Sequence, residues 1–159
     1  NLLHRLVARA MQMDVKILGA LCVIVTAEGP VPTLFIPDPD SITKVMLDWE
    51  PEQVLQLAAT GTGCLLVHRS VLVDMFEQSG GSKNCWFGFD IRTGESGLEW
   101  ALGEDVSFCL RAGEAGHRTY VDTTAQVGHH KGPKVWWPTA TKETPATIVP
   151  RFDDSNAHA

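Results

Sequence analysis

Apolar residues recur at helical spacing at the start of the chain, and a nearly continuous apolar run follows them. The spacing predicts an amphipathic helix over residues 1–13. Its apolar positions are Leu2, Leu3, Leu6, Val7 and Ala10. Residues 15–26 are rich in valine, isoleucine and leucine, which is typical of a buried β-strand. The sequence is therefore expected to begin with a helix and a buried strand.

Short apolar runs alternate with proline and glycine in the next part of the chain. Four prolines between residues 28 and 40 predict a loop or an edge strand. Further strands are expected within residues 42–49, 54–59 and 64–68. The last two flank a tight glycine passage formed by residues 61–63.

Two helices are expected in the second half of the chain. Ser70 is a suitable N-cap for the first, which should end near residue 78, before the sequence Ser-Gly-Gly. The second and clearest covers residues 104–115, with acids in its first turn and Gly116 as its stop signal. Between the two helices, residues 82–103 are predicted to form a loop that is unusually rich in aromatic residues.

The end of the sequence is less regular. Strands are expected at residues 118–121 and 125–128. Prolines and polar residues dominate after these strands, so residues 1–138 are expected to form one domain and residues 139–159 an extended tail. The mixture of strands and helices indicates an α/β or α+β fold.

Composition and charge exclude several classes of protein. A hydrophobic content of 44% and a charged content of 20% are ordinary for a soluble domain of 159 residues. The net charge of -6, with no basic cluster, argues against non-specific binding of nucleic acid. The longest apolar stretch, residues 15–27, contains Lys16 and is too short to span a bilayer. Four cysteines without a C-x-x-C pair favour a reducing, cytoplasmic location.

Two acids open the helix predicted at residues 104–115. Glu104 and Asp105 follow Gly103, whose missing side chain leaves space for a ligand beside the start of the helix. A carboxylate in this position can act as a general base toward a hydroxyl nucleophile. The alternative is that both acids only complement the helix dipole, which is worth about 0.3–1 kcal/mol for each.

Two histidines after the last predicted strand are the second candidate. His129 and His130 are neighbours, and neighbouring side chains in an extended segment point to opposite faces. Neutral imidazole binds Mn²⁺-like ions as well as zinc, so one of the two can face a metal ion or a phosphate. The alternative is that both are ordinary loop histidines.

Several stretches follow one another in an order that is familiar from one protein family. They are residues 59–71 (ATGTGCLLVHRSV), the pair Trp86-Phe87, residues 102–112 (LGEDVSFCLRA), residues 115–122 (AGHRTYVD) and residues 127–131 (VGHHK). The ordered set resembles family 2-like nucleotide-sugar glycosyltransferases of the GT-A fold, with bacteriophage-encoded and bacterial members nearest. The resemblance covers residues 50–135, more loosely residues 1–35, and implies an α/β fold with a mixed sheet flanked by helices.

On the acceptor side, the resemblance assigns roles to the matched acids and aromatic residues. Asp105 would be the catalytic base, which removes the proton of the acceptor hydroxyl in an inverting transfer. Glu104 would orient the acceptor or the base. Trp86 and Phe87 would form part of the acceptor wall, while Arg111 would hold its helix through an ion pair.

On the donor side, the resemblance implies a nucleotide-diphosphate sugar and a divalent cation, Mn²⁺ or Mg²⁺. The glycine passage, made of Gly61, Thr62 and Gly63, would border the substrate. His129 would approach the metal ion or the donor diphosphate, with His130 and Lys131 beside it.

One departure from the family pattern concerns its metal-binding D-x-D acid pair. The D-x-D sequence of this chain, Asp38-Pro39-Asp40, lies in a proline-rich stretch after the first strand, whereas the family places its pair before the first helix seen here. Asp38 and Asp40 are therefore expected to be surface turn residues. The chain is expected to be the C-terminal, acceptor-side part of the domain, without most of the N-terminal donor-binding half. It would then transfer little sugar by itself.

Two other functions remain open from the sequence. A non-catalytic carbohydrate- or protein-binding module would use the aromatic residues and no metal ion. A metal-dependent hydrolase would use His129 and Asp105 to release free sugar without an acceptor.

Overall fold

The computed structural model describes the backbone of residues 1–26, 29–82, 84–131, 134–141 and 144–152. Side chains are described for residues 1–24, 31–82 and 84–128. In chain order, the first elements are α1 (Leu2–Met13), β1 (Ile17–Leu21), β2 (Val23–Thr26), β3 (Gly29–Pro32), β4 (Leu34–Asp38), β5 (Ile42–Val45), β6 (Val54–Leu57), β7 (Ala59–Thr60) and β8 (Leu65–Val67). They are followed by α2 (Arg69–Gln78), β9 (Asp90–Thr93), β10 (Glu99–Leu102), α3 (Glu104–Glu114), β11 (Thr119–Gln126), β12 (His129–Lys131), β13 (Lys134–Thr141) and β14 (Thr144–Phe152).

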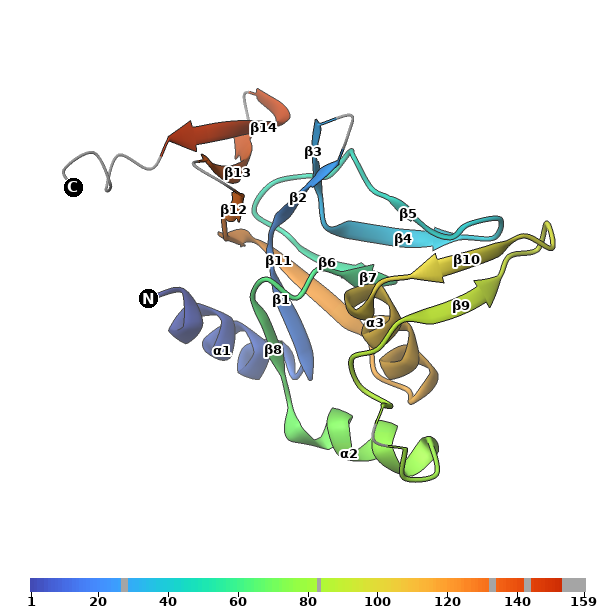
Figure 1. The fold of residues 1–159 in the computed structure, drawn as a ribbon. Helices are drawn as coiled ribbons and strands as arrows, with labels where there is room; N and C mark the ends of the chain where they lie inside the picture. The colour runs from blue at the N-terminus through green and yellow to red at the C-terminus, as the bar shows by residue number, and fades with distance from the viewer. Residues whose placement is uncertain (27–28, 83, 132–133, 142–143, 153–159) are drawn as a thin grey trace, which may run out of the picture.

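A four-stranded mixed sheet forms the centre of the molecule, in the order β6-β11-β1-β8 (Figure 1). Strand β1 runs parallel to β11 and antiparallel to β8, and β6 is antiparallel to β11. Every residue of β1 is buried, as expected for a central strand covered on both faces.

Helices cover both faces of this sheet, because successive side chains of a strand point to opposite sides. On one face, Leu18 and Ala20 of β1 pack against Leu6 and Ala10 of α1. On the other face, Ile17 packs in a cluster to which α2 and α3 contribute. The helical members of that cluster are Val71, Met75, Phe108, Cys109 and Ala112. The predicted α/β class, with a mixed sheet flanked by helices, is confirmed.

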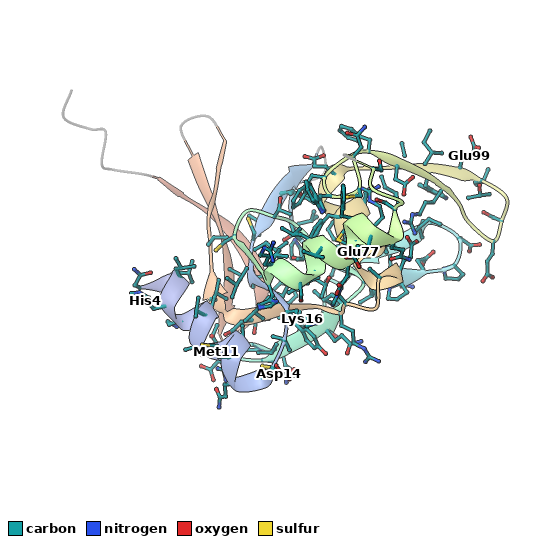
Figure 2. All side chains as sticks on the ribbon, turned by 90° about the horizontal axis from the view of Figure 1, so that it is seen from below. His4, Met11, Asp14, Lys16, Glu77 and Glu99 are labelled. Atoms are coloured by element: carbon teal, nitrogen blue, oxygen red, sulfur yellow. The ribbon has the colours of Figure 1, made fainter. Side chains whose placement is uncertain are left out.

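Helix α1 begins and ends where its sequence provides caps. The side chain of Asn1 accepts a hydrogen bond from the amide of Leu3 at 3.0 Å, and Asp14 ends the helix in the left-handed conformation with φ 53°. The exposed side of α1 carries His4, Met11 and Asp14 (Figure 2). This confirms the helix predicted for residues 1–13.

Smaller sheets surround the central one. Strands β5, β4 and β7 form a three-stranded sheet, β2 pairs with β3, and β9 pairs with β10. Pro37 is tolerated in the middle strand β4, because β7 pairs only with Leu34 and Phe35 and ends before it. Strands β12, β13 and β14 pair in that order and lie beside β2 and β3 (Figure 1).

Several local predictions were wrong. Residues 28–40, predicted to be a loop or an edge strand, contain β4, the middle strand of its sheet, and the strand predicted for residues 54–59 is divided into β6 and β7. Residues 82–103, predicted to be a loop, contain the hairpin β9–β10. The single strand predicted for residues 15–26 is divided into β1 and β2 at Cys22, and the two strands predicted within residues 118–128 are one strand, β11. His68, and not Ser70, caps α2, because its side chain accepts the amide hydrogen of Ser70.

The predicted boundary between residues 138 and 139 falls within β13, and β14 returns antiparallel to it. Residues 153–159 lie outside the described residues. Among the helices that are described, none is long and apolar enough to cross a membrane.

The hairpin β9–β10 is fixed to the turn between β4 and β5. The indole of Trp100 donates a hydrogen bond to the carbonyl of Asp40 at 2.8 Å, and the amide of Glu95 donates to the carbonyl of Pro39 at 2.8 Å. A methyl group added to Gly94 would lie 2.0 Å from that Asp40 carbonyl oxygen. The glycine is therefore required by the close approach of two backbones.

Replacing Gly94 by alanine should lower the free energy of unfolding by about 1–3 kcal/mol, because the hairpin must move away from the turn. Urea denaturation measures the loss. Gly113, an exposed residue of α3 with open space around it, is the matched control. Gly113→Ala should raise the free energy of unfolding by about 0.5–1 kcal/mol, because alanine is the better helix former. Equal effects of the two variants would contradict this packing.

Candidate functional site

The predicted base and the glycine passage meet in the structure. Asp105 lies in the first turn of α3, and Thr62 lies in the turn between β7 and β8. The hydroxyl of Thr62 donates a hydrogen bond to Oδ1 of Asp105. Two stretches identified separately in the sequence are thus in contact, although 43 positions separate these residues.

Both glycines of the passage lie close to residues that follow strands β1 and β3. A methyl group on Gly61 would lie 2.9 Å from Cγ2 of Thr33, and one on Gly63 would lie 3.1 Å from Sγ of Cys22. A side chain at Gly61 would require Thr33 to move, and one at Gly63 would require Sγ of Cys22 to shift by a few tenths of an ångström. The passage therefore packs through its glycines and presents Thr62 to Asp105.

Buried hydrogen bonds hold the residues next to the glycine passage in place. The hydroxyl of Thr60 donates to the carbonyl of Thr33 at 2.8 Å, and the hydroxyl of Thr33 donates to the carbonyl of Cys22 at 3.3 Å. Thr60 and Thr33 are at most 2% exposed. Satisfied polar groups in a core fix one arrangement, because an unpaired group there is costly.

The segment that leads to the predicted histidines passes close to the glycine passage. The amide of Val127 donates to the carbonyl of Leu21 at 2.9 Å, and a methyl group on Gly63 would lie 4.0 Å from Cγ2 of Val127. Strand β12 begins two residues later, at His129. The side chains of His129, His130 and Lys131 lie outside the described residues, so their predicted contacts with a metal ion or diphosphate stay predictions.

Of the two predicted aromatic wall residues, Trp86 has a packing role. Its indole donates a hydrogen bond to the carbonyl of Leu72 at 2.9 Å, and its ring stacks with Phe76 at 6.1 Å between centroids. Phe87 lies parallel to Phe108 of α3, with 4.4 Å between centroids, and is 51% exposed. Phe87 lies in the loop before β9 and therefore offers an exposed aromatic surface that packs against the helix carrying Asp105.

Arg111 holds the aromatic loop in place. Its guanidinium donates hydrogen bonds to the carbonyls of Cys85, Trp86 and Gly88 at 3.2, 2.9 and 2.9 Å. It also lies 3.6 Å from a carboxylate oxygen of Asp90, so the predicted ion pair is present. The sequence did not indicate the three carbonyl contacts, because every residue has a backbone carbonyl and its position depends on the fold.

Asp105 lies near protonated thiols. Burial raises the pKa of Cys22, and the negative charge of Asp105 raises it further. Burial likewise raises the pKa of Cys109, with a smaller contribution from Asp105. Both thiols are therefore poor nucleophiles at neutral pH.

The D-x-D sequence of the chain is used for local structure. Asp38 accepts hydrogen bonds from the amides of Asp40 and Ser41 at 3.1 and 3.0 Å, and lies 3.2 Å from Nζ of Lys44. The Ser41 amide, followed by the Lys44 and Ser41 side chains, lowers the pKa of Asp38 to about 2. This confirms the prediction of a turn.

No group of three or more histidine, cysteine, aspartate or glutamate residues among the described side chains could hold a metal ion. The residues whose side chains are described therefore do not fit the divalent cation that the resemblance implies.

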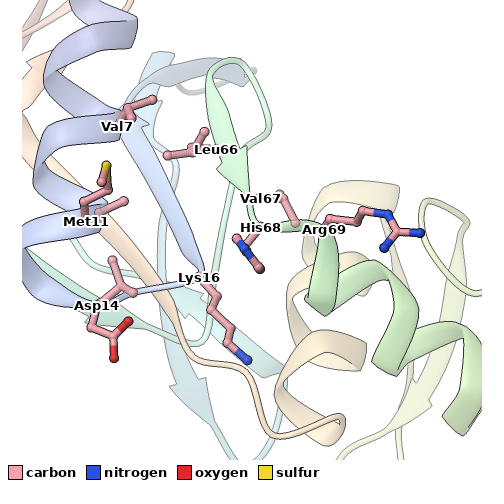
Figure 3. A pocket seen from close by; sticks show the side chains of 10 residues that line it. Val7, Met11, Asp14, Lys16, Leu66, Val67, His68 and Arg69 are labelled. Carbon is pink, nitrogen blue, oxygen red and sulfur yellow. The ribbon is translucent and has the colours of Figure 1, made fainter.

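A groove of about 410 Å³ lies elsewhere, between α1 and β8 (Figure 3). Val7 and Met11 line it from the helix, and Leu66 lines it from the strand. Lys16 and His68 lie at one end. The groove is mainly apolar, and neither Thr62 nor Asp105 is among the residues that line it.

Comparison of the chain with protein-family models, with curated proteins and with solved structures found no match.

Proposed function

We propose that this chain is the acceptor-side part of a GT-A glycosyltransferase, with Asp105 as the base of an inverting sugar transfer. The observation that supports the proposal most directly is the hydrogen bond from Thr62 to Asp105. It joins the glycine passage to the start of α3, the two stretches on which the resemblance chiefly rests.

The proposed reaction needs one correctly placed carboxylate. Asp105 takes the proton of the acceptor hydroxyl as that oxygen attacks the anomeric carbon of the donor sugar. The bond from the anomeric carbon to the diphosphate oxygen breaks, and the nucleoside diphosphate leaves with the electron pair. Attack opposite the leaving group inverts the anomeric centre, by the same geometry as inverting hydrolysis.

Three features of the described residues support this role. The backbone amides of the first turn of α3 favour a negative charge at Asp105. Within the described residues, Oδ2 of Asp105 accepts no hydrogen bond, so it is available to an acceptor hydroxyl. The exposed ring of Phe87, which stacks on Phe108 of the same helix, adds a flat apolar surface.

The proposal includes a donor-binding half that carries the metal-binding acids, since Asp38 is already used by its turn and by Lys44. Such a half would be the partner of this chain, together with a nucleotide sugar and a hydroxyl acceptor.

The direct experiment measures transfer of isotope-labelled sugar to a hydroxyl acceptor, by the protein together with its donor-binding half. Transfer that depends on Asp105 supports the proposal. Release of free sugar without an acceptor would support a hydrolase instead. Glycan binding that persists in EDTA and is unchanged in Asp105→Asn, with no transfer, would support a binding module.

A further inference from the structure

The oxygens of the Asp105 carboxylate have different surroundings. Oδ1 accepts the hydrogen bond of the Thr62 hydroxyl, while Oδ2 has no hydrogen-bond partner among the described residues. Without such a partner, an aspartate side chain at this position exchanges between staggered rotamers about its Cα–Cβ bond. Fixing one oxygen therefore also fixes the direction in which the other points.

Thr62 can fix this carboxylate because its own position is fixed. The flanking glycines lie next to Thr33 and Cys22, so that an added Cβ would come within 2.9 Å of Cγ2 of Thr33 at Gly61 and within 3.1 Å of Sγ of Cys22 at Gly63. The buried hydrogen bond from the hydroxyl of Thr60 to the carbonyl of Thr33, at 2.8 Å, anchors the start of the passage and so limits movement of the backbone at Thr62.

We propose that Thr62 is a positioning residue, which holds Oδ1 of Asp105 so that Oδ2 faces the acceptor hydroxyl. This role rests on the proposed function, because it assigns the free oxygen to proton transfer. Thr62 itself touches neither the acceptor nor the donor in this role. A base that rotates among several orientations spends less time in the reactive one, and this lowers kcat without weakening substrate binding.

The test compares Thr62→Val, which keeps the shape and removes the hydroxyl, with Thr62→Ser, which restores it. Thr62→Val should lower kcat by about 10- to 100-fold, since hydrogen bonds to charged groups are among the stronger ones. The KM for the nucleotide sugar should stay within about twofold, and Thr62→Ser should recover most of kcat. Thr93→Val is the matched control, because Thr93 is exposed on the outer face of β9.

A second measurement reads the contact without any activity. Three-bond NMR couplings about the Cα–Cβ bond of Asp105 should report one staggered rotamer in the wild type and in Thr62→Ser, and an average of rotamers in Thr62→Val. A single unchanged rotamer in Thr62→Val would overturn the positioning role, as would failure of Thr62→Ser to restore kcat. If the wild type transfers no sugar, the proposed function fails, while the couplings still decide whether Thr62 positions Asp105.

Discussion

Replacing Asp105 by asparagine is expected to lower the rate of sugar transfer by about 10²- to 10⁴-fold, the usual contribution of a general base. Asparagine has nearly the same shape, and its side-chain oxygen can still accept the hydrogen bond of Thr62. The substitution therefore removes basicity and leaves the packing at the start of α3 unchanged. Initial rates of labelled-sugar transfer at saturating donor measure the effect.

The matched control for this prediction is Asp48→Asn. Asp48 is exposed, and it makes no hydrogen bond or ion pair within the described part of the chain. Its replacement changes the net charge equally and should leave the transfer rate unchanged. Full activity in Asp105→Asn would remove the assignment of the base.

Phe108→Ala should lower the free energy of unfolding by about 3–5 kcal/mol, the range found for buried phenylalanine. Phe108 is 0% exposed and lies in the cluster formed by α2, α3 and Ile17 of β1. The substitution removes core contacts and leaves a cavity beneath Phe87, whose ring loses its stacking partner. Urea denaturation of the two proteins measures the difference.

Phe89→Ala provides the comparison, because Phe89 belongs to the same residue type and is 82% exposed. Its removal should change the free energy of unfolding by less than about 0.5 kcal/mol. A loss below 1 kcal/mol for Phe108→Ala would instead mean that α3 does not pack on the sheet as described here.

The two predictions address different levels of the same helix. Phe108 anchors α3 to the core, while Asp105, in the first turn of that helix, is the proposed base. Asp105→Asn should lose transfer and keep its free energy of unfolding, whereas Phe108→Ala should mainly lose free energy of unfolding. Such a result would distinguish the role proposed for Asp105 from the packing role of Phe108.

The hairpin β9–β10 explains why some of the fold was not predicted. The charged residues of strand β9 are half-buried: Arg92 binds Asp90 at 3.1 Å and Glu114 of α3 at 2.7 Å. Its apolar residue Ile91 points outward and is 67% exposed. In β9 the usual rule, with apolar side chains inside and polar ones outside, is reversed, so its sequence pattern does not resemble that of a half-buried strand.

The packing contacts of Trp86 were not predicted for a related reason. A tryptophan in an aromatic stretch is compatible with a binding wall and with packing on a neighbouring helix. Only its contacts with Leu72 and Phe76 of α2 distinguish the two.

The sequence by itself determined the helices at residues 1–13 and 104–115, the stop at Gly116 and the presence of buried strand within residues 15–26. These depend on interactions between residues three or four positions apart, or on continuous burial, which residue types reveal directly. Tertiary structure alone decided that β11 lies parallel to β1, with Thr119 beside Ile17, and that the glycine passage reaches the start of α3. Such pairings join residues far apart in the chain through hydrogen bonds and close backbone packing, which are open to many residue types and so leave little signal in a single sequence.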